Sequence, residues 1–352
     1  MYNLDDPRTY STLDPTNLGQ RLRDLPAQCK AAWQQTRAVA LPKFRTPINH
    51  VIIAGMGGSA IAGDLVADLA APQSTVPITV VRDIHLPFAL DDHSLVIACS
   101  YSGNTRETLS LFHQAVEAQA AVVAVTGGGV LAQRAAEVGV LLLPVNTPGE
   151  ARSAVGHNLM VLLGLLHRLE LVETKETDVQ TAVAALAQRI AQLVSTNPTR
   201  DNPAKQLAQE LEGKLPMVYG GGLFRGVARR WKTQFNENAK VWAFFETIPE
   251  LLHNSVESYS SGPAGQPLMV LLLQPDTGPM ELESHYEVVS ELLNRNSVTH
   301  RVLQGDGGTP LAQLLGILVL GDYVSYYLAL LRGVDPSPTP TLEEGKELLA
   351  GS

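Results

Sequence analysis

The sequence predicts an α/β protein with two doubly wound halves, each a parallel sheet with helices on both faces. Three observations favour this fold. Short runs of Val, Ile and Leu alternate with segments of helical periodicity, and continuous apolar runs are typical of strands buried on both faces. Glycine-rich joints follow a strand in each half. The length of 352 residues suits two medium-sized domains.

Residues 1–45 are predicted to form a helical N-terminal segment, because Leu18, Leu22 and Leu25 recur at helical spacing. A regular alternation of strands and helices follows in residues 46–170, the first α/β domain. Its predicted strands are residues 50–54, 78–81, 95–99, 121–126 and 140–144. Its predicted helices are residues 59–70, 105–118, 130–137 and 157–170. Strands separated by helices favour right-handed crossovers and a doubly wound sheet.

Residues 171–205 are more polar and helical, and they are predicted to connect the two halves. The alternation restarts in residues 206–332, the second α/β domain, and residues 333–352 form a Pro-rich and then helical C-terminal tail. The second domain has predicted strands at 217–219, 268–273 and 299–303 and a long apolar helix at 309–332. The joints AGMGGSAIAGDL and YGGGLFRGVARR occupy equivalent places, which indicates two copies of one module.

Composition and charge exclude several classes of partner. The chain is 45% hydrophobic, with a net charge of −9 and no run of Lys and Arg, so nucleic acid and membrane surfaces are not expected partners. The two cysteines, Cys29 and Cys99, show no metal-ligand spacing and suit a reducing compartment. We expect a cytoplasmic protein, because the sequence shows no secretory signal pattern and no apolar stretch long enough to span a bilayer.

The segment Gly-Met-Gly-Gly-Ser at residues 55–59 lies between a predicted strand and a predicted helix. Glycine lets the backbone approach a ligand closely, and the first N–H groups of a helix attract anions. Gly58 and Ser59 are therefore candidate phosphate-binding residues. Taken alone, the segment also fits a tight turn with Ser59 as the helix cap.

The same segment fits a dinucleotide-binding motif. Gly55, Gly57 and Ala60 satisfy G-x-G-x-x-A, and Asp83 lies near the end of the next strand, at about the expected distance. A Rossmann-type NAD(P)-dependent oxidoreductase is therefore an alternative interpretation.

A second polar loop directly follows the strand at residues 95–99. It contains Ser100, Ser102 and Thr105, three hydroxyl groups within six residues. Hydroxyls and helix-start N–H groups can together bind a terminal phosphate without a metal or a cofactor. A dinucleotide does not need this second loop, so the pair of loops favours a phosphorylated small molecule.

GMGGSAIAGDL followed by SYSGNTRETL resembles the sugar isomerase (SIS) domain, a phosphosugar-binding module. Within that group the chain is similar to the bifunctional phosphoglucose/phosphomannose isomerases. Further matches are PGEARSAVGHN at 148–158, FNENAK at 235–240, LLHNSVES at 251–258 and VDPSPTPTLEEGK at 334–346. The resemblance implies two SIS domains of flavodoxin-like topology and a homodimer. It also implies an isomerase that interconverts glucose 6-phosphate and mannose 6-phosphate with fructose 6-phosphate.

The resemblance also implies catalytic roles. Glu237 would be the base that moves a proton between C1 and C2 through an enediolate, and Arg152 would stabilise the developing negative charge. Asn236 and Asn238 are expected to orient Glu237. His253 and Lys346 would help open the sugar ring. In related isomerases the equivalent histidine reaches into the partner's site, and this sequence leaves open which subunit His253 serves.

Thr339 matches the family position whose small side chain leaves room for the C2 epimer, so that mannose phosphate is accepted as well. Its alternative role is to stiffen a Pro-flanked linker. No metal is expected, because one Glu and one His are too few ligands. A non-catalytic phosphosugar-binding protein is a further alternative, although such regulators usually carry a helix-turn-helix part, for which the short N-terminal segment leaves no room.

Overall fold

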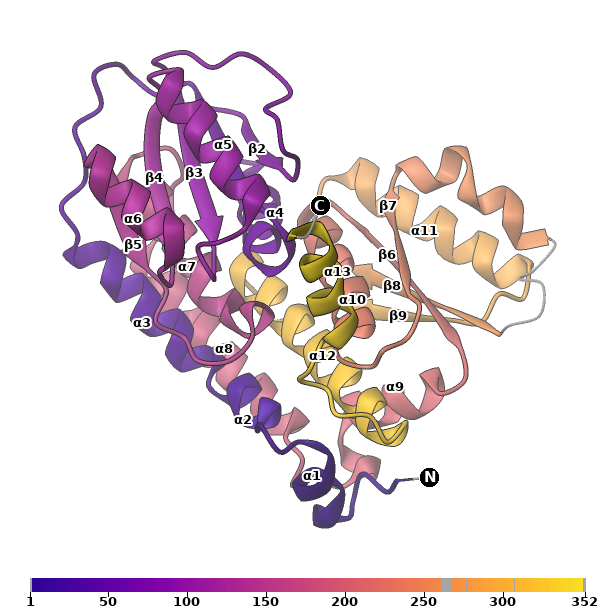
Figure 1. Cartoon of the computed structure of the whole chain (residues 1–352). Coiled ribbons are helices and arrows are strands. Elements are labelled where there is room, and N and C mark those ends of the chain that lie inside the picture. Colours follow the sequence, from indigo (N-terminus) through magenta and orange to yellow (C-terminus); the bar gives the residue numbers. More distant parts are fainter. Residues whose placement is uncertain (1, 261–266, 277, 307, 351–352) are drawn as a thin grey trace.

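The computed structural model describes residues 2–260, 267–276, 278–306 and 308–350. Two α/β lobes lie side by side, with helices between them (Figure 1). Every strand pair in the described residues is parallel, and helices cover both faces of each sheet, which confirms the predicted fold class. The predicted domain boundaries stay predictions.

The first lobe contains a five-stranded sheet with the order β2-β1-β3-β4-β5. Its strands are β1 (His50–Gly55), β2 (Ile78–Val81), β3 (Ser94–Ser100), β4 (Ala121–Thr126) and β5 (Leu141–Pro144). Val51 on β1 aligns with Ile78 on one side and Leu95 on the other. This order is flavodoxin-like, and ligands bind at the carboxyl ends of such strands, where the strand order reverses.

Alternate side chains of the first sheet pack against different helices. Ile53 and Ile97 belong to the core cluster that includes α4 and α7, whereas Ile52 and Val96 pack with α5 and α6. These helices are α4 (Gly57–Ala70), α5 (Arg106–Glu117), α6 (Gly129–Val138) and α7 (Val155–Arg168). Both faces of the sheet are therefore covered, as the apolar runs predicted.

The second lobe repeats the first with one strand fewer. Its sheet has the order β7-β6-β8-β9, which matches the first four strands of the other sheet. The elements are β6 (Leu215–Gly221), α10 (Arg225–Glu237), β7 (Phe244–Ile248), β8 (Leu268–Gln274), α11 (Met280–Arg295), β9 (His300–Gln304) and α12 (Pro310–Leu331). The two predicted copies of one module are thus confirmed by topology.

The remaining helices join and flank the lobes. They are α1 (Pro7–Leu13), α2 (Leu18–Arg23), α3 (Leu25–Ala38), α8 (Glu176–Leu193), α9 (Pro203–Leu211) and α13 (Pro340–Ala350). One described helix, α12, is long and apolar enough to cross a membrane, and 94% of its most apolar window is buried inside the protein. It packs against α8, α9 and α10 as a core helix.

One of the hydrophobic core clusters extends through both lobes. It includes Ile53 and Ile97 from the first sheet, Leu271 from the second sheet, and Leu318 from α12. The helix α13 is mostly exposed, and the Leu349 carbonyl near its end accepts a hydrogen bond of 3.0 Å from Arg106 Nη1 at the start of α5. The two lobes therefore share one interior, and α13 reaches from the second lobe to the first.

Candidate active site

The first predicted phosphate loop lies where β1 ends and α4 begins. Gly57 has φ of 50°, a left-handed conformation that suits glycine. A Cβ on Gly58 would lie 3.1 Å from the backbone of Ala151 and Arg152, so glycine permits this close approach. The Ser59 hydroxyl is buried and accepts a hydrogen bond of 3.2 Å from the Tyr101 N–H of the second loop. The two loops are thus in direct contact.

The second loop is built around a tight turn. The Ser100 and Thr105 hydroxyl oxygens lie 2.9 Å apart, and the Ser102 hydroxyl accepts a bond of 3.2 Å from the Asn104 N–H. Gly103 has φ of 70°, and a Cβ there would lie 1.8 Å from the Gly128 carbonyl oxygen. Only glycine fits this position, which explains the glycine among the three hydroxyl-bearing residues.

Both helices that follow these loops begin without a side-chain cap in the described structure. Their first N–H groups are therefore available to a ligand, and the positive end of each helix dipole lies at the same edge of the sheet. The structure brings together the candidate residues Gly58, Ser59, Ser100, Ser102 and Thr105 at the carboxyl edge of the first sheet, β1 and β3 being adjacent strands.

Arg152 connects this edge to the second lobe. It lies in a short 3-10 helix, Ala151–Ala154, and its side chain is only 4% exposed. Its Nε donates to Asn238 Oδ1 at 2.8 Å, and its Nη1 lies 3.4 Å from Glu237 Oε2. Its Nη2 donates to the carbonyl oxygens of Pro336 and Ser337 at 2.8 and 2.7 Å.

The hydrogen bonds of Arg152 use all but one of its guanidinium N–H groups. A guanidinium has five N–H donors, and four are used by Asn238, Glu237, Pro336 and Ser337. The second Nη1 N–H has no hydrogen-bond partner among the described residues, and its nitrogen lies 3.4 Å from Glu237 Oε2. Burial lowers the pKa of Arg152, while Glu237 and Glu150 act in the opposite direction.

Glu237 is the last residue of α10 and lines a cavity of about 390 Å³. Its side chain is 25% exposed, and it shares the cavity with Asn236, Lys240 and Thr339. The predicted contacts from the two asparagines to the Glu237 carboxylate are wrong. Asn236 Nδ2 donates to the Val241 carbonyl at 2.9 Å, and Asn238 is bonded to Arg152. Asn238 therefore orients Arg152, which in turn contacts Glu237.

His253 and Lys346 are not among the described residues that line the cavity of Glu237. His253 ends a 3-10 helix, Glu250–His253, is exposed, and is absent from the lining of the cavity. Lys346 lies on the exposed helix α13. Among the described residues, contacts or a shared cavity thus join Glu237 to Arg152 and to Thr339, and Lys346 lies on the helix whose first turn lines that cavity.

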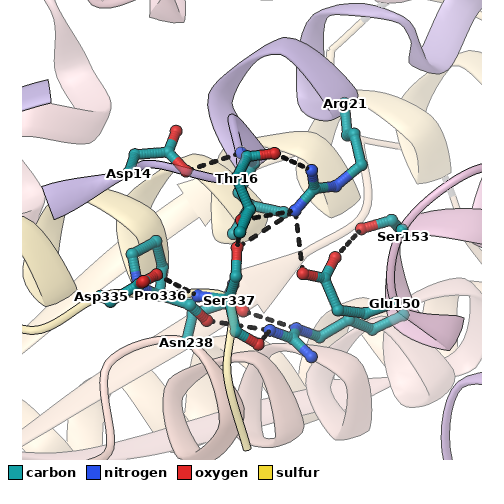
Figure 2. A network of polar contacts seen from close by, with 12 residues as sticks. Asp14, Thr16, Arg21, Glu150, Ser153, Asn238, Asp335, Pro336 and Ser337 are labelled. Carbon is teal, nitrogen blue, oxygen red and sulfur yellow. Dashed lines mark hydrogen bonds and ion pairs between the residues drawn. The ribbon is translucent and has the colours of Figure 1, made fainter. Parts of the chain in front are cut away.

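Sequence reasoning missed three contributors to this region. Lys240, which lines the cavity, was part of the FNENAK motif but had no predicted role. Its Nζ donates to the carbonyl oxygens of Asn238 at 3.3 Å and Pro336 at 3.2 Å, and also to that of Glu237. Arg21 and Ser337 join the same network from the N-terminal segment and the tail (Figure 2). Their contacts span hundreds of residues, so no local signal could have revealed them.

A carboxylate from the first lobe occupies the equivalent helix start in the second lobe. Asp68, on α4, accepts hydrogen bonds of 2.6 Å from the Gly226 N–H and 2.5 Å from Arg225 Nη2 at the start of α10. No three His, Cys, Asp or Glu side chains gather as a metal site among residues the structure describes. The start of α10 is thus occupied by Asp68, whereas the start of α4 is open to an anion.

Comparison with known proteins decides the family. Residues 200–349 match the bacterial phospho-glucose isomerase C-terminal SIS domain. A bifunctional phosphoglucose/phosphomannose isomerase of Caldicellulosiruptor bescii is 32% identical over 93% of this chain and 97% of its own length. The enzyme of that name from Aquifex aeolicus is 33% identical over 88% of this chain and 93% of its own. The chain belongs to the bifunctional phosphoglucose/phosphomannose isomerase family.

A solved structure agrees with this assignment at the level of the fold. A glucose-6-phosphate isomerase like protein from Thermus thermophilus is 24% identical and superposes with a TM-score of 0.66 over 99% of both chains. Membership of the isomerase family also sets aside the Rossmann interpretation of Gly55, Gly57 and Ala60. The sheet order β2-β1-β3-β4-β5 differs as well from the order 3-2-1-4-5-6 of dinucleotide-binding folds.

Proposed function

We propose that the protein is an aldose–ketose isomerase that interconverts glucose 6-phosphate and mannose 6-phosphate with fructose 6-phosphate. The observation that carries this proposal is the pair formed by Glu237, which lines the cavity, and Arg152, whose backbone adjoins Gly58 of the first polar loop. Isomerisation needs one base and one cation near C1 and C2. Family membership supports the same activity.

The substrate phosphate is proposed to bind at the carboxyl edge of the first sheet. The N–H groups at the starts of α4 and α5 and the hydroxyls of Ser59, Ser100, Ser102 and Thr105 suit a doubly charged phosphate. The close approach of Gly58 to Arg152 supports a sugar that extends from this edge towards Glu237. The net charge of −9 disfavours nucleic acid and anionic membranes as partners, so the phosphate is proposed to be bound locally by these N–H and hydroxyl groups.

In the proposed mechanism, Glu237 takes the proton from C2 of the open-chain aldose and returns it to C1, while the hydroxyl proton of O2 passes to O1. The unused Nη1 N–H of Arg152 stabilises the negative charge that develops on the enediolate oxygens. Glucose and mannose phosphates share this intermediate, because they differ only in configuration at C2. Thr339, which lines the same cavity as Glu237, is proposed to leave room for both epimers.

Ring opening is assigned to His253 and Lys346, with His253 acting in the site of a second subunit. The exposed position of His253 outside its own cavity supports this arrangement. An exposed aromatic pair also supports a homodimer: Trp242 and Phe244 are 76% and 44% exposed and stack with their ring centroids 6.2 Å apart. Free, buried cysteines suit a cytoplasmic location.

The test is a coupled assay on glucose 6-phosphate and mannose 6-phosphate with the Glu237→Gln variant. Gln keeps the shape of the side chain but cannot accept the proton, so both activities should fall by about 10²–10⁴-fold. Glu281→Gln, on the exposed start of α11, is a matched control that should keep full activity. Near wild-type turnover in folded Glu237→Gln would remove Glu237 from the role of base.

A further inference from the structure

The segment that carries Thr339 links the buried helix α12 to the exposed helix α13, and Arg152 binds its backbone. Arg152 Nη2 donates to the Pro336 and Ser337 carbonyl oxygens at 2.8 and 2.7 Å. The position of these two residues fixes where the chain enters the cavity wall at Thr339. A group that holds Ser337 therefore also restrains the chain at Thr339, two residues further on.

The N-terminal segment holds Ser337 from the opposite side. The Ser337 hydroxyl lies 2.5 Å from Thr16 Oγ1 and accepts a hydrogen bond of 3.1 Å from Arg21 Nη2 (Figure 2). The same Nη2 donates to Glu150 Oε1 at 2.9 Å, and Glu150 Oε2 accepts from the Ser153 hydroxyl at 2.9 Å. Ser337 is 4% exposed, so these contacts lie in the interior.

The Pro-Gly-Glu-Ala-Arg sequence that ends at Arg152 contacts Arg21 through Gly149 and Glu150. Gly149 has φ of 98°, and a Cβ there would lie 2.6 Å from Arg21 Cδ. A side chain at this position would thus displace Arg21 from Glu150 and Ser337. The Arg21–Glu150 pair is also well shielded, with side chains 13% and 22% exposed, which makes it stronger than a surface ion pair.

Helix α2, which carries Arg21, is itself firmly anchored. Asp14 accepts hydrogen bonds from the Leu18 and Gly19 N–H groups at 2.7 and 2.9 Å. The same carboxylate accepts a bond of 2.9 Å from the Tyr326 hydroxyl on the buried helix α12. Arg21 therefore extends from a helix that is held in place, and its hydrogen bond to Ser337 links the position of α2 to that of the C-terminal tail.

We propose that Arg21 is a positioning residue for substrate specificity: through Ser337 and Glu150 it holds the segment of residues 335–339 in place, and so fixes the space that Thr339 leaves beside C2 of the sugar. The N-terminal segment then contributes to substrate specificity through Arg21. This proposal rests on the proposed isomerase function for the part that concerns selectivity, whereas the mechanical hold on the tail is independent of it.

The test combines hydrogen exchange with selectivity in the Arg21→Met variant. Met keeps much of the apolar stem but removes every hydrogen bond, so backbone N–H groups in residues 333–339 should exchange about tenfold faster. The ratio of kcat/KM for mannose 6-phosphate to that for glucose 6-phosphate should rise by about threefold or more, because a looser segment crowds C2 less. Ser337→Ala removes the hydroxyl alone and should shift both readouts in the same direction, by less.

Arg23→Met is the matched control, since Arg23 lies on the same helix but donates to Ser195 Oγ at 2.9 Å instead of to the tail. It should leave both readouts at the wild-type value. Unchanged exchange of residues 333–339 in folded Arg21→Met and Ser337→Ala would overturn the proposal, and so would faster exchange with an unchanged substrate ratio. A wild-type protein inactive on both aldose phosphates would contradict the proposed function, while the exchange result would still decide whether Arg21 holds the tail.

Discussion

Lys240 adopts a left-handed backbone conformation, with φ of 55°, three residues after Glu237. Its Nζ donates to three carbonyl oxygens, those of Glu237, Asn238 and Pro336. The first two belong to the end of α10, where helix carbonyls lack partners within the helix, and the third belongs to the tail. Lys240 therefore ties the residue proposed as the base to the segment that carries Thr339.

The titration of Lys240 predicts an alkaline loss of activity. Burial lowers the pKa of Lys240 to about 8, and Arg152 acts in the same direction, against the carboxylates of Asp335, Glu237 and Glu150. A neutral amine has two N–H donors for three carbonyl acceptors. We therefore expect kcat to fall above about pH 8, as one of these hydrogen bonds is lost. A pH–rate profile at saturating substrate measures this decrease, the alkaline limb of the profile.

The control for this prediction is Lys240→Arg, whose guanidinium stays charged at all accessible pH values. In this variant, the pH at which kcat begins to fall should be higher by about one unit or more. An identical alkaline limb in both proteins would show that Lys240 does not control the rate.

The same pKa also affects stability. Because the pKa of Lys240 is lowered on folding, the unfolded chain binds more protons between about pH 8 and 10.4, so this group makes the free energy of unfolding rise with pH in that window.

Single residues of the site were predictable where a motif resembles that of a known family. Glu237, Arg152 and Thr339 were predicted through the resemblance of FNENAK, PGEAR and the Pro-rich tail, and in the structure Glu237 and Thr339 line one cavity while Arg152 contacts Glu237. The roles of Asn238 and Arg21 were not predictable. They depend on which side chain lies opposite after folding, and for Arg21 the partner Ser337 is 316 residues away.

The helices α4 and α10 occupy equivalent places in the two lobes, but their N-termini differ. The start of α4 is open towards the polar loops, whereas the start of α10 is bonded to Asp68 of the other lobe. A carboxylate at a helix N-terminus satisfies backbone donors and neutralises the positive end of the dipole. Asp68 thus fixes α10, the helix that carries Glu237, to the first lobe.

The buried position of Asp68 predicts an unusual pH dependence of stability. Burial raises the pKa of Asp68 to about 6, although Arg225 and the Gly226 N–H act to lower it. The folded state therefore binds more protons than the unfolded state between about pH 4 and 6. Stability from this group is present below that range and is lost as pH rises through about 6, by up to about 3 kcal/mol.

The measurement is denaturant unfolding of the wild type and Asp68→Asn at pH 4.5 and pH 7. Other titrating groups are common to both proteins and cancel in the difference. The free energy of unfolding of the wild type relative to Asp68→Asn should be lower at pH 7 than at pH 4.5. A relative stability that increases with pH would mean that the ion pair with Arg225 outweighs the cost of burial.

Most elements were predictable because their apolar runs are continuous. The strands of the first lobe agree with the predictions to within one or two residues, since both faces of that sheet are buried. The strand β7 was missed. It is a five-residue edge strand with the sequence Phe-Phe-Glu-Thr-Ile, and Phe244 is 44% exposed, so it shows neither a continuous apolar run nor a regular alternation.

At the scale of the whole molecule, the lobes face each other through polar contacts within a shared apolar core. Arg230 on α10 is held within the second lobe by two hydrogen bonds to Asp322 on α12, at 3.0 and 2.7 Å, and its Nη2 reaches across to the first lobe, where it donates to the Arg152 carbonyl at 3.1 Å. The repeat of the module was visible in the sequence, but this mutual orientation was not. It depends on complementary surfaces of segments far apart in the chain.

The proposed homodimer leads to a prediction about shared sites. Glu237 lines its own cavity, whereas His253 is exposed outside it. If each site takes Glu237 from one subunit and His253 from the other, then a mixed dimer of Glu237→Gln and His253→Ala subunits has one site with both defects and one intact site. A symmetric dimer of this kind should recover about half of the wild-type activity.

The measurement uses two affinity tags to purify the mixed dimer, and compares its turnover of glucose 6-phosphate with that of each variant homodimer. The homodimers carry one defect in every site, so both should be nearly inactive. With His253 acting in its own subunit, each site of the mixed dimer would also carry one defect. Activity no higher than the mean of the two homodimers would therefore place His253 in its own subunit's site, and a monomer in solution would reject the shared site altogether.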